Sequence, residues 1–303
     1  MVLYILQQLV NALSYGSILG LLAVGYTMIY GILGLINFAH GEIFMIGAFS
    51  CYLFATALNL PWVTAALLAI ITSTISGLLL ERFIYRPCIR RGASVLTIFI
   101  VSFAASIFLR YLFMMFFTDK RRAFPIPAFF EKIYFVGGIV IGLRDILIFA
   151  TTVLIMLVIS YFVKYSKLGI AMRAVSYDKM TASFMGINST QIIKLVFVIG
   201  SILAAISGLE YGLSFGIVNP GMGFNPGLTG FIAAVLGGIG NVPGAMIAGF
   251  IVGIGEILFV AILPAIYSPL RPLFVWILLF FILFLKPTGL FRPNVKFEGD
   301  WGE

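Results

Sequence analysis

The chain has 303 residues, of which 62% are hydrophobic and only 10% are charged, and it contains 30 phenylalanines. This is more apolar surface than the core of a soluble protein can bury, so a soluble fold is excluded. The apolar residues fall into runs of about 20, the length of a helix that crosses a bilayer, without the alternation of a membrane barrel. We predict an all-α polytopic membrane protein with a single domain, residues 1–303.

The formal net charge is +8. Lys and Arg collect between the apolar runs, where the orientation of a membrane protein explains them, so they imply no nucleic-acid partner. The two cysteines, Cys51 and Cys88, lack the spacing of a disulfide or a metal site. No basic residue precedes Arg82. The first run therefore lacks the charged start of a secretory signal, and we expect it to remain as a membrane span.

The first apolar run covers residues 3–34, and its Gly16 and Gly20 have the spacing that lets helix backbones pack closely. A short polar stretch, residues 36–42, stands at the head of the second run, residues 43–58. We expect the second helix to begin within the membrane or at its edge. Further apolar runs cover residues 63–80, 93–117, 146–163, 192–215, 245–263 and 269–285.

The basic residues orient these runs. The loops at residues 81–91 and 164–191 are rich in Lys and Arg and are predicted to be cytoplasmic. The Pro-containing connection at residues 118–145 is then external, although it also carries basic residues. Three basic residues after the last run predict a cytoplasmic C-terminus: Lys286, Arg292 and Lys296.

Residues 216–244 break the regular pattern. They contain two Asn-Pro pairs and several glycines, a strong turn signal. The apolar run within this segment, residues 228–239, is too short for an ordinary crossing. Broken helices line a protein-enclosed path in transporters, so we expect this segment and the Asn37 stretch to border a transport route. Counting the short run as a crossing gives about nine spans with an external N-terminus, and counting it as re-entrant gives about eight. The path residues predicted here are Asn37, His40, Glu42, Asn225 and Asn241.

Three carboxylates, Glu42, Glu210 and Glu256, stand in apolar surroundings, where a charge must be paired or hydrated. We expect structural pairing or a place at the membrane interface more often than contact with a solute, and the sequence fixes no partner. His40 and Glu42 are two residues apart and cannot share a helix face, and a single histidine makes no metal site. No cofactor is implied.

The sequence contains no phosphate-binding loop and no Gly-x-Ser-x-Gly motif. If ATP drives transport, another chain must hydrolyse it. From the residues alone, a transporter or transporter subunit ranks first, a channel second and an intramembrane enzyme third.

The polar segment between Lys164 and Asn188 combines positive charge with a soft apolar surface, and glycines at 169 and 186 bracket it as start and stop signals. We predict a helix on the membrane surface. The residues alone leave open whether it is an ordinary interfacial helix or a docking helix for a soluble partner.

Three segments, INFAHGEIFMIGAF from Ile36, KLGIAMRAVSYDKMTASFMGIN from Lys167 and GGIGNVPGAMIAGFIVGIGE from Gly237, occur in this order. Together they resemble the branched-chain amino acid ABC transporter permease family, in particular its LivH-type subunit. The resemblance extends over nearly the whole chain. Permeases for urea and short amides are similar over the same motifs, so the solute stays open.

The resemblance implies a multi-pass protein of the cell membrane that works with a LivM-like second permease, two ATP-binding cassette ATPases and an external solute-binding protein. The segment after Lys164 would then be the loop that couples to the ATPases, moving as one rigid helix. It keeps Ala182 and Gly186 of the family's Glu-Ala-Ala motif and lacks its acidic position. The coupling residues implied are Gly169, Arg173, Ala174, Asp178, Ala182 and Gly186.

Overall fold

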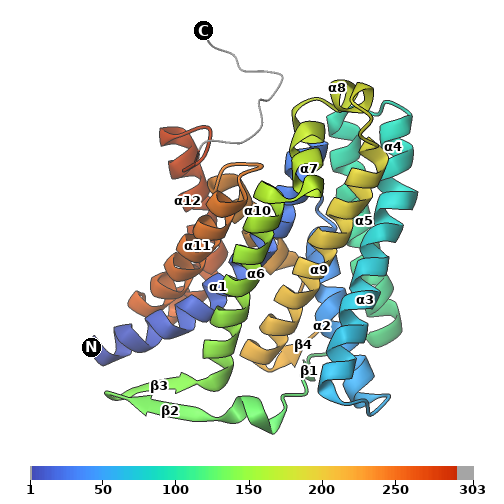
Figure 1. Ribbon diagram of the computed structural model, residues 1–303. Coiled ribbons are helices and arrows are strands. Elements are labelled where there is room, and N and C mark those ends of the chain that lie inside the picture. Colours follow the sequence, from blue (N-terminus) through green and yellow to red (C-terminus); the bar gives the residue numbers. More distant parts are fainter. Residues whose placement is uncertain (1, 292–303) are drawn as a thin grey trace.

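The computed structural model describes residues 2–291 and is almost entirely helical (Figure 1). Arg292 and Lys296, used above to place the C-terminus, lie outside the described residues. The α-helices are α1 (Val2–Leu33), α2 (His40–Thr56), α3 (Trp62–Leu80), α4 (Arg86–Arg90), α5 (Val95–Phe117), α6 (Leu143–Tyr165), α7 (Lys167–Tyr177), α8 (Lys179–Phe184), α9 (Ser189–Phe215), α10 (Phe224–Leu236), α11 (Val242–Ile262) and α12 (Arg271–Leu285).

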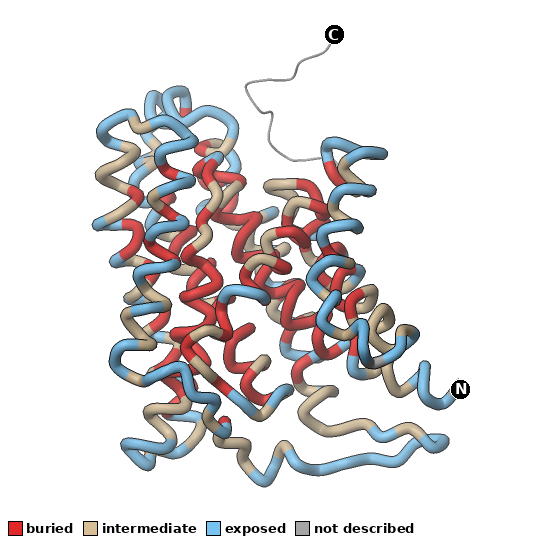
Figure 2. Tube along the Cα trace, turned by 180° about the vertical axis from the view of Figure 1, so that it is seen from behind, coloured by how far each residue is buried: buried red, intermediate tan, exposed pale blue. Residues whose placement is uncertain are grey.

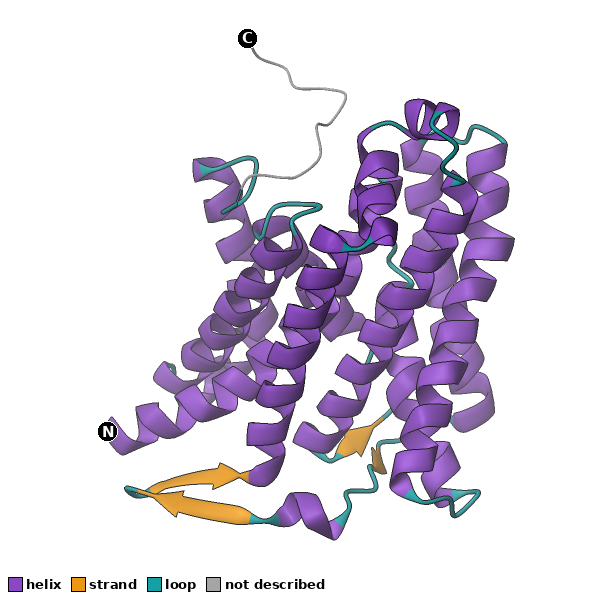
Figure 3. Ribbon diagram, in the orientation of Figure 1, coloured by secondary structure: helices purple, strands orange, loops and turns teal. Residues whose placement is uncertain are grey.

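A π-helical turn (Glu81–Tyr85) joins α3 to α4, and two 3-10 helices (Ala128–Glu131 and Ala265–Leu270) lie in connections. Strands β2 (Ile133–Val136) and β3 (Ile139–Gly142) form an antiparallel hairpin, and the short β1 (Arg122–Ala123) pairs with β4 (Ile217–Val218). Figure 3 shows these strands at the end of the bundle opposite α7 and α8.

Within residues 2–291, seven helices are long and apolar enough to cross a membrane. The apolar α10, with 13 residues, and α2, with 17, are shorter. This agrees with the prediction of about eight or nine apolar helices, some short or broken.

The described chain passes nine times between the two ends of the bundle. The amide of Phe124 binds the carbonyl of Gly216 at 2.9 Å, which fixes the start of the broken segment at the strand end. The end of the broken segment lies at the α7–α8 end of the bundle, because the amide of Gly240 donates to the hydroxyl of Thr27, near the end of α1, at 2.8 Å. The segment containing α10 therefore traverses the bundle, which decides for nine passes over eight and places the N-terminus opposite α7 and α8 (Figure 1).

Helix α1 lies at the centre and packs against α6, α9, α10 and α11. Its crossing with α11 is made by glycines: a Cβ on Gly253 would meet the backbone of Gly16, and a Cβ on Gly249 would meet the backbone of Gly20. This confirms the close packing predicted from the glycine spacing in the first run. Small residues allow such approach where apolar lipid leaves dispersion and close packing to hold helices together.

The outer helices differ sharply from α1. In the most apolar window of each, 89% of α1 residues are buried but only 17% in α6 and 6% in the span of α12. Figure 2 shows the buried centre and the exposed outer helices. The exposed faces are apolar, with Phe280 and Phe284 of α12 each more than 70% exposed. Such faces suit lipid or another membrane helix, and the protein is therefore a multi-pass membrane protein.

Candidate functional site

The polar segment after α6 forms two helices, α7 and α8, where the sequence analysis expected one rigid helix between Gly169 and Gly186. The break is at Asp178, whose backbone is extended (φ −156°, ψ 112°). The Asp178 carboxylate accepts hydrogen bonds from the amide of Met180 at 2.8 Å and from the hydroxyl of Thr181, which starts α8. These hydrogen bonds hold the pKa of Asp178 below its usual value. The expectation of one helix was wrong because Asp178 is a strong N-cap.

The corner between α6 and α7 is tightly fixed. Ser166 caps α7 by accepting the amide of Gly169 at 2.9 Å, and a Cβ on Gly169 would collide with the carbonyls of Phe162 and Val163. The guanidinium of Arg173 reaches back and donates to the carbonyls of Val163 and Lys164. A cation there also complements the partial negative charge at the C-terminal end of α6. Arg173 thus binds the start of α7 to the end of α6.

The other predicted coupling residues have distinct places. Ala182 is buried, and Ala174 is partly buried and accepts the amide of Asp178 through its carbonyl. Gly186 follows α8 with a left-handed φ of +82°, and a Cβ there would touch nothing within 4 Å. Glycine is favoured at Gly186 by the backbone conformation alone.

The α7–α8 segment presents an exposed apolar surface at the end of the bundle. Its most exposed large residues are Phe184 and Met185, at 78% and 80% exposure, followed by Tyr177 and Met180. A group of exposed apolar and thioether side chains beyond the membrane spans suits contact with a protein.

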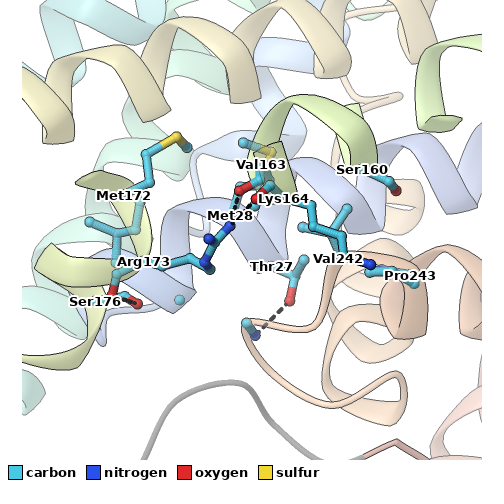
Figure 4. A pocket seen from close by; sticks show the side chains of 13 residues that line it. Thr27, Met28, Ser160, Val163, Lys164, Met172, Arg173, Ser176, Val242 and Pro243 are labelled. Carbon is cyan, nitrogen blue, oxygen red and sulfur yellow. Dashed lines mark hydrogen bonds between the residues drawn. The ribbon is translucent and has the colours of Figure 1, made fainter. Parts of the chain in front are cut away.

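A cavity of about 540 Å³ lies at the base of this segment (Figure 4). It is bounded by α1, α6, α7 and the start of α11, and both Thr27 and Arg173 line it. The turn at Gly240, whose amide donates to the Thr27 hydroxyl, also lines the cavity. Movement of α7 relative to α1 would therefore change the size of this cavity.

The starts of α2 and α10 meet deep inside the bundle. A Cβ on Gly41 would lie 2.9 Å from the Cα of Gly227, and the backbone of Gly223 also lies against Gly41. The two helices therefore cross at their first turns with backbone against backbone. We predicted that α2 begins within the membrane or at its edge, and its first turn is buried inside the bundle. The break before α10 was also predicted.

Three of the predicted path residues lie at this break. The hydroxyl of Tyr85 donates to Oδ1 of Asn37 at 2.7 Å. His40 is fully buried with its ring 4.6 Å from that of Tyr26, and within residues 2–291 neither of its ring nitrogens has a hydrogen-bond partner. His40 and Glu42 contact different groups, as their spacing indicated.

Glu42 is almost completely buried and forms an ion pair with Arg110 at 3.4 Å, while Ser106 donates a hydrogen bond to the same oxygen at 3.0 Å. Arg110 also lies over the ring of Phe224, at 4.3 Å, and so connects α5 to α10. Arg110 and Ser106 were missed as partners. An arginine inside an apolar run was the available signal, because such a residue requires a counter-charge.

The remaining predicted path residues lie elsewhere. Asn225 lines a separate cavity beside α11 and α12. Asn241 caps α11 by accepting the amide of Gly244 at 2.9 Å. The structure therefore places Asn37, His40 and Glu42 at the start of α2 and Asn225 in the first turn of α10, whereas Asn241 lies apart at the start of α11.

The other intramembrane carboxylates are also partnered. Glu210 accepts hydrogen bonds from the hydroxyls of Thr151 and Thr152 at 2.9 to 3.2 Å. Glu256 forms an ion pair with Arg271 at 2.8 Å. All three carboxylates thus have a partner within the protein: an arginine for Glu42 and Glu256, and two threonine hydroxyls for Glu210.

The chain is similar over its length to known transport proteins. A model of the family described as the branched-chain amino acid transport system, permease component, matches residues 8–285. The high-affinity branched-chain amino acid transport system permease protein BraD of Pseudomonas aeruginosa is 40% identical over 96% of this chain and 97% of its own. The corresponding LivH protein of Escherichia coli K12 is 39% identical over 97% of this chain and 98% of its own.

A more distant relative is the probable branched-chain amino acid transport permease protein LivH of Methanocaldococcus jannaschii, 28% identical over 85% of this chain and 82% of its own. Among solved structures, PsaBC from Streptococcus pneumoniae in complex with Fab contains a similar chain, with a TM-score of 0.50 and 14% identity over 92% of this chain and 91% of that one. That likeness concerns the fold alone. The sequence matches show that the chain belongs to the branched-chain amino acid transport system permease family.

Proposed function

We propose that this chain is a membrane-spanning permease subunit of an ATP-driven importer for leucine, isoleucine and valine. The observation that carries the proposal is the full-length similarity to BraD and LivH, whose names give that transport activity. The chain is a transport subunit and not an enzyme, and ATP hydrolysis belongs to separate partner chains.

In this proposal four partners complete the importer: a second, LivM-like permease, two ATPase subunits and an external binding protein. The apolar faces of the outer helices supply surface for a second permease. The end with α7 and α8 is cytoplasmic, and the chain past Leu285 emerges there, because the amide of Leu290 binds the carbonyl of Leu236 at 2.7 Å. The strand end is external and receives the solute.

The α7–α8 segment docks on the ATPases through the apolar surface around Phe184 and Met185. Docking moves α7, and the corner held by Gly169 and Arg173 transmits this movement to α6. The same movement changes the cavity between α7 and α1. The solute follows a path past the α2 and α10 break, near Asn37, His40 and Glu42, and the energy comes from nucleotide chemistry on other chains.

The transport proposal is tested with the five components reconstituted in proteoliposomes and radiolabelled leucine. We expect uptake that requires ATP and the binding protein. Uptake by this chain alone, driven by a gradient and indifferent to ATP, would identify a channel or secondary carrier instead. Uptake of urea or acetamide in place of leucine would place the chain with the amide permeases.

Docking is tested with Phe184→Asp, which puts a charge into the apolar surface. We expect the ATPases no longer to co-purify with the membrane subunits, since a desolvated charge opposes an apolar contact. The matched control is Phe135→Asp, because Phe135 is also 78% exposed but lies on the hairpin at the other end. Equal loss of ATPase with both variants, or with neither, contradicts the docking assignment.

A further inference from the structure

A second cavity lies away from the α7–α8 segment and is lined in part by Asn225 and Pro226, in the first turn of α10. Its volume is about 160 Å³, and α1, α9, α10, α11 and α12 all contribute to its walls. Pockets for drug-sized ligands occupy about 300–1,000 Å³, so this one suits a smaller molecule. Phe215, the last residue of α9, lines the cavity and stands two residues before β4, so the cavity lies toward the end of the bundle that carries the strands.

One wall of this cavity is charged. Nε of Arg271 lies 2.8 Å from Oε1 of Glu256, and the Glu256 side chain is only 4% exposed. The phenol ring of Tyr15 lies under the guanidinium, 4.5 Å away. Within residues 2–291, Oε2 of Glu256 and both Nε and Nη2 of Arg271 are buried without a hydrogen bond of good geometry, although Nε lies in ion-pair distance of Oε1. The ion pair therefore leaves hydrogen-bonding capacity on both its carboxylate and its guanidinium, although buried polar groups are normally satisfied.

The remaining walls combine an apolar face with two small polar groups. Leu228, Ile232, Val275 and Trp276 line the cavity, and Asn225 and Thr229 stand among them on α10. Apolar walls with few, well-placed polar groups are typical of small-molecule sites.

We propose that this cavity binds the zwitterionic end of an aliphatic α-amino acid during its passage through the protein. The guanidinium of Arg271 binds the carboxylate, the carboxylate of Glu256 binds the ammonium group, and the apolar wall accepts the side chain. A ligand with both charges matches both unused groups, whereas a ligand with one charge leaves the other unpaired. The inference rests on the proposed function, since it names the place in this subunit where that solute is held.

The test uses the full-length protein in lipid nanodiscs, with Asn225→Cys as a reporter, because Asn225 is exposed and lines the cavity. The partly exposed native thiol is removed by Cys88→Ser, and the parent without the added thiol gives the background. The rate of labelling by a cationic methanethiosulfonate is measured with L-leucine, with 4-methylpentanoate and with 3-methylbutylamine. The last two keep the carbon skeleton and one charge each.

We expect leucine at about ten times its Kd to slow labelling about tenfold, because about a tenth of the sites stay free. The single-charge analogues at the same concentration should leave the rate unchanged. The double variant Glu256→Gln/Arg271→Gln, which leaves no lone buried charge, should abolish the protection. If leucine gives no protection, or an analogue protects equally, the inference is overturned.

Tryptophan fluorescence provides a second measurement that does not depend on correct folding of the Asn225→Cys variant. Leucine should change the tryptophan fluorescence of the unmodified protein and leave that of Trp276→Phe unchanged; the same response in both proteins contradicts binding at this cavity. Leucine uptake by the complete importer together with no protection overturns the site but keeps the transport function. Protection without leucine uptake overturns the transport function but keeps the site.

Discussion

The bundle interior and the α7–α8 segment are held in opposite ways. In the interior, α1 crosses α11 with glycine backbones in contact, and α2 meets α10 in the same manner. The α7–α8 segment is instead fixed by hydrogen bonds at its corners, from Ser166, Arg173 and Asp178. Its inner face buries Met172, Val175 and Ala182, and its other large apolar residues face outward. The close-packed interior tolerates little displacement, whereas the segment has a smaller buried contact to lose when it moves.

The difference suits the two roles proposed above for this subunit. Close backbone contact would keep the proposed path closed, and the polar, capped corner would pass motion to α6. Substitutions in the interior should therefore reduce stability first, and substitutions in the segment should reduce coupling first. Four predictions test this contrast, beginning with the largest effect.

Arg110→Ala should have the largest effect, because it leaves Glu42, which is 1% exposed, as an uncompensated buried charge. Breaking a buried pair in this way costs about 3–5 kcal/mol. The measurement is thermal unfolding in detergent, with the yield of folded protein. The control is Glu42→Gln/Arg110→Ala, which removes the stranded charge and should recover most of the loss. Equal instability of the double variant would show that the arginine acts through packing and not through its charge.

Gly249→Ala should have the next largest effect, since the added Cβ would push against the backbone of Gly20. Overpacking of this kind costs about 1–3 kcal/mol. The matched control is Gly221→Ala, whose Cβ would have no neighbour nearer than 3.5 Å. Thermal unfolding of the two variants gives the comparison, and a loss of equal size would argue against a rigid crossing of α1 and α11.

Gly186→Ala tests the segment. Its φ of +82° places a side chain in the left-handed region, at about 1–2 kcal/mol. Open space around the residue means that the effect is strain alone. We expect faster proteolysis near α8 and reduced ATPase coupling, with little change in the melting temperature of the bundle. Gly186→Asn should be milder, because Asn adopts this conformation more readily; a lower melting temperature with unchanged proteolysis would contradict the prediction.

Protonation of the Asp178 carboxylate, which caps α8, should have the smallest effect on stability, and this effect depends on pH. Hydrogen bonding to Thr181 lowers the pKa of this carboxyl in the folded protein. The cap therefore contributes fully above the unfolded pKa of about 3.9 and is lost as the pH falls through the lower, folded value. The protection factor of the Met180 amide, its exchange rate relative to the intrinsic rate at the same pH, should fall in that acidic window in the unmodified protein. Asp178→Asn should remove the pH dependence, and an identical acid response in this variant would assign it to another group.

Sequence alone predicted the helical class, the membrane spans and the start of α2, because composition and run length determine these. It also favoured pairing for Glu42, Glu210 and Glu256. It could not name Arg110, Thr152 or Arg271 as partners, since helices far apart in the chain meet only through packing.

Two further features, the division of the α7–α8 segment and the number of passes, could not be predicted from the sequence. The division of the segment at Asp178 was missed although an N-cap residue marks it, because positive charge and apolar spacing continued across the break. The number of passes stayed open because the length of a short helix does not show where its ends lie. The contacts of Phe124 with Gly216 and of Thr27 with Gly240 supplied those positions.

The meeting of α2 with α10 at Gly41 and Gly223 has an electrostatic consequence. Each helix N-terminus carries roughly half a positive charge from its aligned peptide dipoles, and here two of them converge inside the bundle. The Glu42 charge nearby is already balanced by Arg110. A proton or alkali cation that enters this crossing meets a positive field, the arrangement by which some water channels exclude ions.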